Sequence, residues 1–244
     1  MKQLLIILIA GCFLYSCKKD QALGLLSNVS SLNVINAIPG SSGLVTNINN
    51  RLLNYRTGSQ IAYGNYKLYN FAGGSTSVVV KQIADTINSV YTNTLNLPGY
   101  TAHSLFLSGT AISPDTLLVE DHLTPASSHP NDSVTHIRFV NLLVGSNPVS
   151  INIQGSPAGS VQASQSYKAI TGFTDFAATS AIPSYVFEFR DAGTGALLKS
   201  YTLTGVNRAS STTANTILFK YLTIVLDGRA TGSPDPNVFL VNNF

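Results

Sequence analysis

Three histidines spaced by seven residues form the one cluster of metal-type ligands in this sequence: His122, His129 and His136, with Asp121 and Asp132 beside them. Imidazole and carboxylate groups bind zinc or copper where a fold holds them rigidly and neighbouring groups orient them. The residues between these histidines are rich in Ser and Pro, which predicts a solvated connector. We therefore predict no metal and no other cofactor, and interpret the three as solvated linker histidines.

Catalytic patterns are weak in this chain. Nucleophilic catalysis needs a Ser or Thr beside a His and an acid, and the sequence has neither a G-x-S-x-G nor an S-x-x-K motif. Glycoside hydrolysis needs two acids across a cleft. The mature chain offers two glutamates, Glu120 and Glu188, each within a strand pattern that favours a solvent-facing side chain. The sequence predicts a protein that is not an enzyme, with an envelope hydrolase as an alternative.

The N-terminal segment predicts lipidation. Residues 1–16 combine a lysine with a short apolar run, which is typical of a signal peptide and too short for the roughly 20 residues of a membrane span. Ser16-Cys17 resembles the bacterial lipobox, in which the cysteine thiol is acylated and becomes the first mature residue. Cys12, after Ala10-Gly11, is the alternative acceptor. Both cysteines lie in this segment, so the mature body has no disulfide framework.

Three other side chains are candidates for O-glycosylation. Thr86, Thr116 and Ser133 each lie between an aspartate and an apolar residue, a triplet that resembles the O-glycosylation signal of some Bacteroidetes-type envelopes. Such triplets also arise by chance in a chain this rich in Ser and Thr.

The aromatic residues of the first half have two interpretations. Tyr69 and Phe71, two residues apart, point to one face of a strand, either into the core or as a platform for sugar rings. Core packing is favoured. The same choice applies to the neighbouring aromatics Tyr55, Tyr63 and Tyr66.

Composition limits the partners. Hydrophobic residues make up 44% of the 244 residues and can build a core, while charged residues make up only 10%. The formal net charge is +3, and the basic residues are scattered without an aromatic-rich strip, which argues against nucleic acid as a partner. A membrane reached through the lipid anchor, a surface glycan or an envelope protein fits better.

The elements that must position any site are predicted to be strands. Apolar residues alternate with a period of two or form short β-branched blocks bounded by Gly, Pro, Asn or Ser, and no long span has helical periodicity. Residues 191–195 supply the glycines of a tight hairpin. We predict an all-β chain with about seven strands in each half.

The two halves repeat each other. The segment 32–43 aligns without gaps with 137–148, so that Asn36 falls on Asn141 and Gly40 on Gly145. A period of about a hundred residues indicates tandem domains. The predicted boundaries are a signal peptide at 1–16, a lipidated tether at 17–30, domain 1 at 31–123, a linker at 124–133 and domain 2 at 134–244. Each half is expected to fold independently.

A family resemblance covers nearly the whole mature chain. The run LLVEDHLTPASSHPNDSVTHIRFVNLLVG, in which a domain ends in Leu-Val-Glu-Asp and a new strand begins after a Pro-containing spacer, resembles the tandem modules of bacterial envelope lipoproteins assigned to DUF4397 (domain of unknown function 4397). The second copy departs further, with Leu-Leu-Val-Gly after Asn141. The resemblance implies immunoglobulin-like β-sandwiches in the cell envelope and brings no catalytic residues.

Together these observations predict a non-catalytic cell-envelope protein, lipid-anchored to the outer membrane, with a binding or structural role. A glycan-binding accessory of an outer-membrane uptake system is the alternative binding role.

Overall fold

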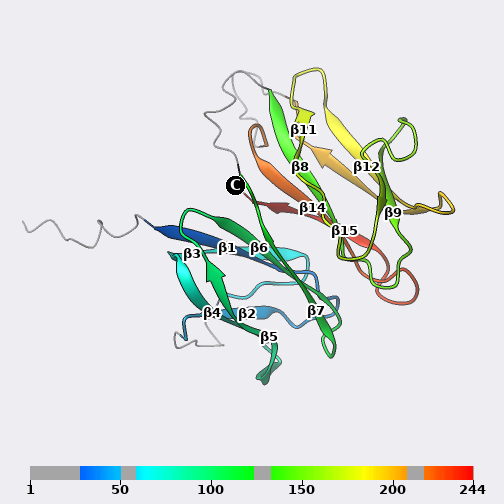
Figure 1. The fold of residues 1–244 in the computed structure, drawn as a ribbon. Coiled ribbons are helices and arrows are strands. Elements are labelled where there is room, and N and C mark those ends of the chain that lie inside the picture. The colour runs from blue at the N-terminus through cyan, green and yellow to red at the C-terminus, as the bar shows by residue number, and fades with distance from the viewer. Residues whose placement is uncertain (1–27, 51–58, 124–132, 208–216, 244) are drawn as a thin grey trace, which may run out of the picture.

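The computed structural model describes residues 28–50, 59–123, 133–207 and 217–243 (Figure 1). Fifteen strands and no helix occur in these ranges, which confirms the predicted all-β fold. No helix there has the length and apolar character that a membrane span requires. The signal peptide, both cysteines and most of the predicted linker lie outside the described residues.

Residues 28–123, here called module 1, form a sandwich of two sheets. One sheet has the order β3-β1-β6-β7 and the other the order β2-β4-β5. Leu32 and Leu105 of the first sheet pack against Val78 and Leu95 of the second, so the core lies between them. The strands are β1 (Val29–Asn36), β2 (Leu44–Ile48), β3 (Asn65–Ala72), β4 (Gly74–Gln82), β5 (Asp85–Leu97), β6 (Ala102–Gly109) and β7 (Pro114–Glu120).

Residues 133–243, module 2, repeat this plan with the orders β11-β8-β14-β15 and β10-β9-β12-β13. The core between the two sheets is rich in aromatic rings: Phe139 packs edge-on against Phe176, Phe187 and Phe189. The strands are β8 (Val134–Asn141), β9 (Val149–Ile153), β10 (Gln162–Gln165), β11 (Thr174–Ala177), β12 (Ser184–Asp191), β13 (Leu197–Thr204), β14 (Tyr221–Asp227) and β15 (Asn237–Asn242). The predicted hairpin at 191–195 joins β12 and β13.

The repeated sequence is a repeated structure. Asn36 donates to the carbonyl of Ile61 and accepts the N–H of Ile38, and Asn141 bonds in the same way with Gln165 and Leu143. In both modules the first strand also runs parallel to the penultimate one, as β1 beside β6 and β8 beside β14. The asparagine shared by the two copies therefore closes the same turn twice.

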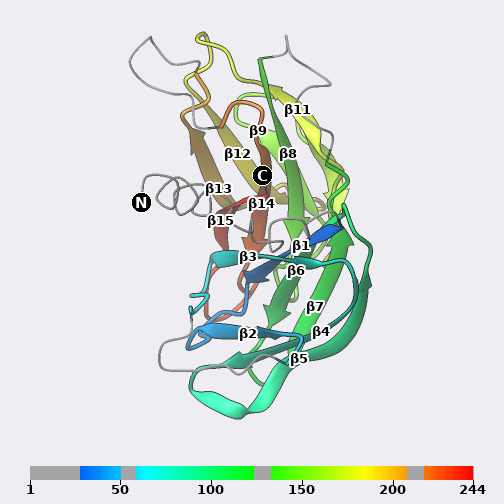
Figure 2. The ribbon, with the colours of Figure 1, turned by 90° about the vertical axis from the view of Figure 1, so that its left-hand side faces the viewer.

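The modules meet face to face. On β1, Leu32 and Val34 enter the module 1 core, while Ile35 on the opposite face joins a third apolar cluster. That cluster lies between the modules, and its buried members are Ile35, Ala37, Phe106, Val140, Leu142, Val225 and Val241. Strands buried on both faces explain the near-continuous apolar runs of β1, β6, β8 and β14. Figure 2 shows the two modules stacked across this junction.

The predicted domain limits lie close to strand ends. Among the described residues no sheet takes strands from both halves, and β8 begins at Val134, the predicted start of domain 2. β1 begins at Val29, so the last two residues assigned to the tether belong to the strand. Val29 pairs with Ala72 of β3, and this pairing extends β1 beyond the sequence pattern.

Candidate functional site

A cavity of about 540 Å³ lies at the junction of the two modules. Module 1 contributes the end of β7 and the residues after it, Glu120, Asp121 and His122. Module 2 contributes His136 and Arg138 of β8, Asp175 of β11, Tyr221 of β14 and the loop at residues 170–173. We call this the junction pocket. Pockets between modules are common ligand sites, and this volume falls in the usual range for small ligands.

His136 is a buried strand residue. It is 8% exposed, its Nδ1 lies 2.6 Å from Oδ1 of Asp175, and its ring stacks on Tyr221 with centroids 4.3 Å apart. The interpretation of this residue as a solvated linker histidine is therefore wrong, because β8 begins at Val134 and carries it into the junction. His122 is exposed as predicted and lies 3.3 Å from Glu120, while His129 is outside the described residues.

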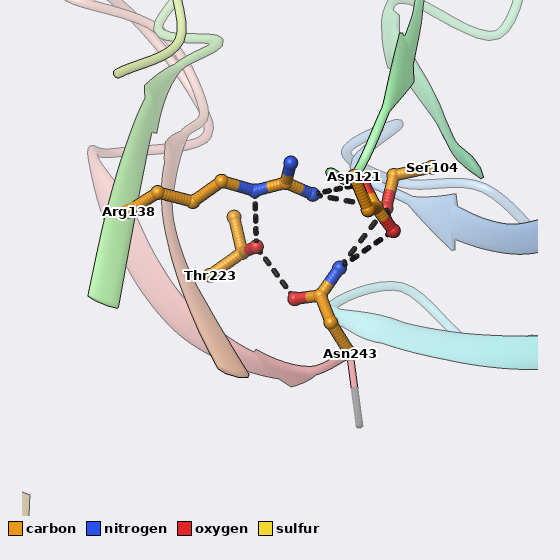
Figure 3. Close-up of polar contacts among 5 residues, drawn as sticks. All are labelled: Ser104, Asp121, Arg138, Thr223 and Asn243. Carbon is orange, nitrogen blue, oxygen red and sulfur yellow. Dashed lines mark hydrogen bonds and ion pairs between the residues drawn. The ribbon is translucent and has the colours of Figure 1, made fainter. Parts of the chain in front are cut away.

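Arg138 anchors a buried polar network that crosses the junction (Figure 3). Its Nη2 donates to Asp121 Oδ1 at 2.6 Å and to Ser104 Oγ at 3.0 Å, and its Nε donates to Thr223 Oγ1 at 2.8 Å. Asn243 closes the network by donating to Ser104 and Asp121. Burial lowers the pKa of Arg138 and the Asp121 carboxylate opposes this shift. The guanidinium remains charged because its ordinary pKa is far above neutral.

Two polar atoms at the pocket are left free by these contacts. Arg138 Nη1 makes no hydrogen bond to any described residue, and Figure 3 shows it pointing away from the network. His136 Nε2 also lacks a partner among the described residues. Neither atom is among the described side-chain atoms that are sealed from solvent without a partner. Both therefore remain available to a ligand in the junction pocket.

The aromatic side chains of the pocket are already engaged. Phe173 lies under the guanidinium of Arg138, with 4.5 Å between Cζ and the ring centroid, and meets Tyr221 edge-on at 5.0 Å. These contacts fix the orientation of Arg138. Because Phe173 and Tyr221 already pack on other side chains, the junction pocket can hold a ligand mainly through polar contacts.

A second cavity of about 530 Å³ continues from the first. The two cavities share Glu120 and His122, and the second is bounded at module 1 by Tyr100, Thr101 and Val29. Tyr100 is 78% exposed and has a φ of 63°, a left-handed conformation that a bulky residue rarely adopts. We call the two cavities together the junction groove. The sequence did not mark Tyr100 as a candidate site residue, because Pro98-Gly99 before it is typical of an ordinary turn.

The predicted glycosylation sites differ in accessibility. Thr86 is exposed at the start of β5, where Asp85 accepts the N–H groups of Ile87 and Asn88. Thr116 is half-buried within β7, and Ser133 is half-buried immediately before β8. The three residues lie in or beside different strands, and only Thr86 is exposed.

Tyr69 and Phe71 are partly buried against the core of module 1, in agreement with the core interpretation. Tyr66 packs against the cluster between the modules, and Tyr55 is outside the described residues. Of the two glutamates, Glu120 lines the junction groove. Glu188 is mostly covered and pairs with Arg190 at 3.0 Å, so the expected solvent-facing position is wrong for Glu188. Within the described ranges no three His, Cys, Asp or Glu residues are placed to hold a metal ion.

No family model matches this chain, and no curated protein matches it. The resemblance to DUF4397 therefore stays a prediction from the sequence.

Proposed function

We propose that this chain is a non-catalytic cell-envelope protein, lipid-anchored at Cys17 to the outer membrane, that binds a small polar ligand in the junction pocket. The observation that carries the binding role is the pair of free polar atoms, Arg138 Nη1 and His136 Nε2, on two nearly buried side chains that line one cavity. Buried polar groups usually have partners. A ligand that supplies the missing partners would be held in a fixed orientation.

Anchoring rests on the N-terminal sequence. The short apolar run followed by Ser16-Cys17 is the pattern expected of an acylated export signal. Stable attachment takes more than one acyl chain, as bacterial lipoproteins of this kind carry. The resemblance to DUF4397 modules also favours a location in the cell envelope.

A hydrolase is the second candidate, and the contact between His136 and Asp175 favours it. A carboxylate that orients an imidazole is two thirds of a catalytic triad. Among the described residues Asp175 is the one hydrogen-bond partner of the His136 imidazole, and the nearby Thr171 hydroxyl donates to the carbonyl of Gly172 instead. In the described part of the chain no nucleophile is therefore hydrogen-bonded to the His136 imidazole, which supports the binding role.

A thermal-shift screen of residues 18–244 against oligosaccharides and short peptides tests the binding role. We expect at least one class of compound to raise the melting temperature, because a ligand that binds only the folded state stabilises it. His122→Ala should weaken the shift, and Ile87→Ala, at an exposed residue outside the groove, should not. If no compound shifts the transition, the binding role is wrong. Release of a cleaved product that His136→Ala abolishes would favour the hydrolase.

A further inference from the structure

The junction groove has the polar character of a site for hydroxyl groups. Nδ1 of His136 faces the Asp175 carboxylate and donates its proton there, so Nε2 is the ring nitrogen that a ligand can reach. Oδ2 of Asp175 and the exposed carboxylate of Glu120 are hydrogen-bond acceptors that line the same cavity. Arg138 Nη1 adds a donor. Sugar hydroxyls both donate and accept, so a polyol satisfies such a mixed set.

The charge of the pocket disfavours an acidic ligand. Glu120, Asp121 and Asp175 contribute three carboxylates, and Arg138 is the one guanidinium among the lining residues. Asp121 is already paired with Arg138, but no Lys or Arg among the described residues forms an ion pair with Glu120 or Asp175. A carboxylate or sulfate entering this space meets like charge at short range. An uncharged ligand avoids that cost.

Tyr100 gives the groove a stacking surface at its far end. Tyr100 is 78% exposed as a residue, while its backbone N–H donates to the carbonyl of Val29 at 2.6 Å. The bulky side chain is therefore held in the left-handed backbone region and in water, two unfavourable conditions at one residue. The apolar faces of pyranose rings pack well on such an exposed aromatic ring.

We propose that the junction groove binds an uncharged oligosaccharide of at least two rings. One ring lies in the junction pocket, where its hydroxyls contact His136, Arg138 and Asp175. The oligosaccharide then continues past Glu120 and His122, and a following sugar ring packs on Tyr100. This assignment rests on the proposed binding function and adds the class of ligand and the direction in which it lies.

The test is isothermal titration of residues 18–244 with matched probes. Gluco-, manno-, galacto- and xylo-oligosaccharides of six rings are the neutral probes, and hexagalacturonate and hexaguluronate are the acidic ones. We expect at least one neutral probe to bind and both acidic ones to fail. Six rings should bind more tightly than one, because a monosaccharide cannot reach both cavities.

Three variants and one control locate the site. Tyr100→Ala should weaken binding by about tenfold, the loss expected for one stacking contact, and Tyr100→Phe should restore it. His122→Ala, at an exposed side chain in the shared wall, should weaken binding without affecting folding, whereas Ile87→Ala should leave it unchanged.

Three outcomes would overturn the assignment. They are preference for the acidic probes, failure of all neutral probes, or neutral binding that Tyr100→Ala leaves intact. A peptide or acidic sugar that binds and is sensitive to His122→Ala would overturn the ligand class and leave the proposed binding function standing. If no compound raises the melting temperature in the thermal-shift screen, both the proposed binding function and the oligosaccharide assignment are wrong.

Discussion

Arg138 of module 2 pairs with Asp121 of module 1 through a contact of 2.6 Å, and both side chains are almost completely buried. Two buried charges from different modules constrain how the modules can pack. Each charge has additional hydrogen bonds, from Ser104 to Asp121 and from Arg138 to Thr223. A pair satisfied in this way tolerates burial, whereas either partner alone would be a desolvated and uncompensated charge.

Arg138→Met should therefore destabilise the protein by about 3–5 kcal/mol, because it leaves Asp121 buried without its cation. Urea denaturation followed by circular dichroism measures the change. The control is Lys168→Gln, which removes an ion pair with Asp115 that also crosses the junction but is about a third exposed. Lys168→Gln should lower the free energy of unfolding by about 1 kcal/mol or less. If both variants lower the free energy of unfolding equally, the buried pair stabilises the protein no more than the exposed pair does.

Asp227 predicts a pH dependence of stability. Its carboxyl is fully buried, accepts a hydrogen bond from Asn237 at 3.1 Å, and forms no ion pair with a described residue. The hydroxyl of Tyr63 from module 1 lies near this carboxyl without good hydrogen-bonding geometry. Burial raises the pKa of Asp227 from 3.8 to about 7. Between these values the folded state holds a proton that the unfolded state has released.

Titration of Asp227 should therefore lower the free energy of unfolding as the pH rises from about 4 to about 7, and should have no further effect above that pH. The total loss is on the order of a few kcal/mol. Asp227→Asn should remove this slope and should be the more stable form at pH 8. Urea denaturation at pH 5, 6, 7 and 8 compares the two proteins. Parallel stability curves would contradict the assignment to Asp227.

The strands and the repeat were predictable from the sequence, because both depend on local patterns. Alternating apolar residues indicate strands wherever they lie in the fold. The gapless match of Asn36 with Asn141 reflects one turn and one set of hydrogen bonds made twice.

The junction could not be predicted in the same way. Arg138 resembled a scattered basic residue on a half-exposed strand, because nothing local shows that a second sheet covers the outer face of β8. The spacing of seven placed His136 with the linker histidines, although the strand pattern from Val134 already included it. A charged residue between the apolar residues of the strand sequence Thr-His-Ile-Arg-Phe-Val was the one available signal of a buried polar network.

The predicted anchor residue is directly testable. Metabolic labelling with a fatty-acid analogue should mark the wild-type protein, and Cys17→Ala should abolish the label because the acylated thiol is lost. Gel fluorescence measures both. Cys12→Ala should keep the label, and loss of label in that variant alone would assign the anchor to Cys12.

Glycosylation is expected first at Thr86. The side chain is exposed beside the turn formed by Asp85, so an enzyme can reach it in the folded protein. Mass spectrometry of protein from its native host should show an added glycan that Thr86→Ala removes. Thr116→Ala should leave the mass of the glycan unchanged, because Thr116 is half-buried in β7. A native mass that contains only peptide and lipid would end this proposal.

The faces that meet at the junction are equivalent faces of the repeat. Strand register matches Asn33 with Arg138, Ser104 with Thr223, and Asp121 with Asn243. The apolar cluster follows the same rule, since Ile35 corresponds to Val140. An interface built from one patch on both partners is the arrangement of a symmetric dimer. The charged pairs break the symmetry, because Arg138 pairs with Asp121 and Lys168 pairs with Asp115 across the junction.

This relationship predicts how separated halves behave. Residues 28–123 and 133–244 each retain a core of their own, so each is expected to fold, but each would expose its side of the apolar cluster. Mixed together, the halves should form a one-to-one complex in preference to either homodimer, because only the mixed complex pairs Arg138 with Asp121. A homodimer of the second half would leave Arg138 opposite Asn243.

Native mass spectrometry and sedimentation of each half and of the mixture measure these species. Arg138→Met in the second half should reduce the preference for the mixed complex while leaving an apolar surface that still associates, and Lys168→Gln added to it should reduce the preference further. If the halves stay monomeric when mixed, the junction is too weak to hold the modules without the linker. If neither half folds alone, the two cores depend on the junction, and the expectation of independent folding is wrong.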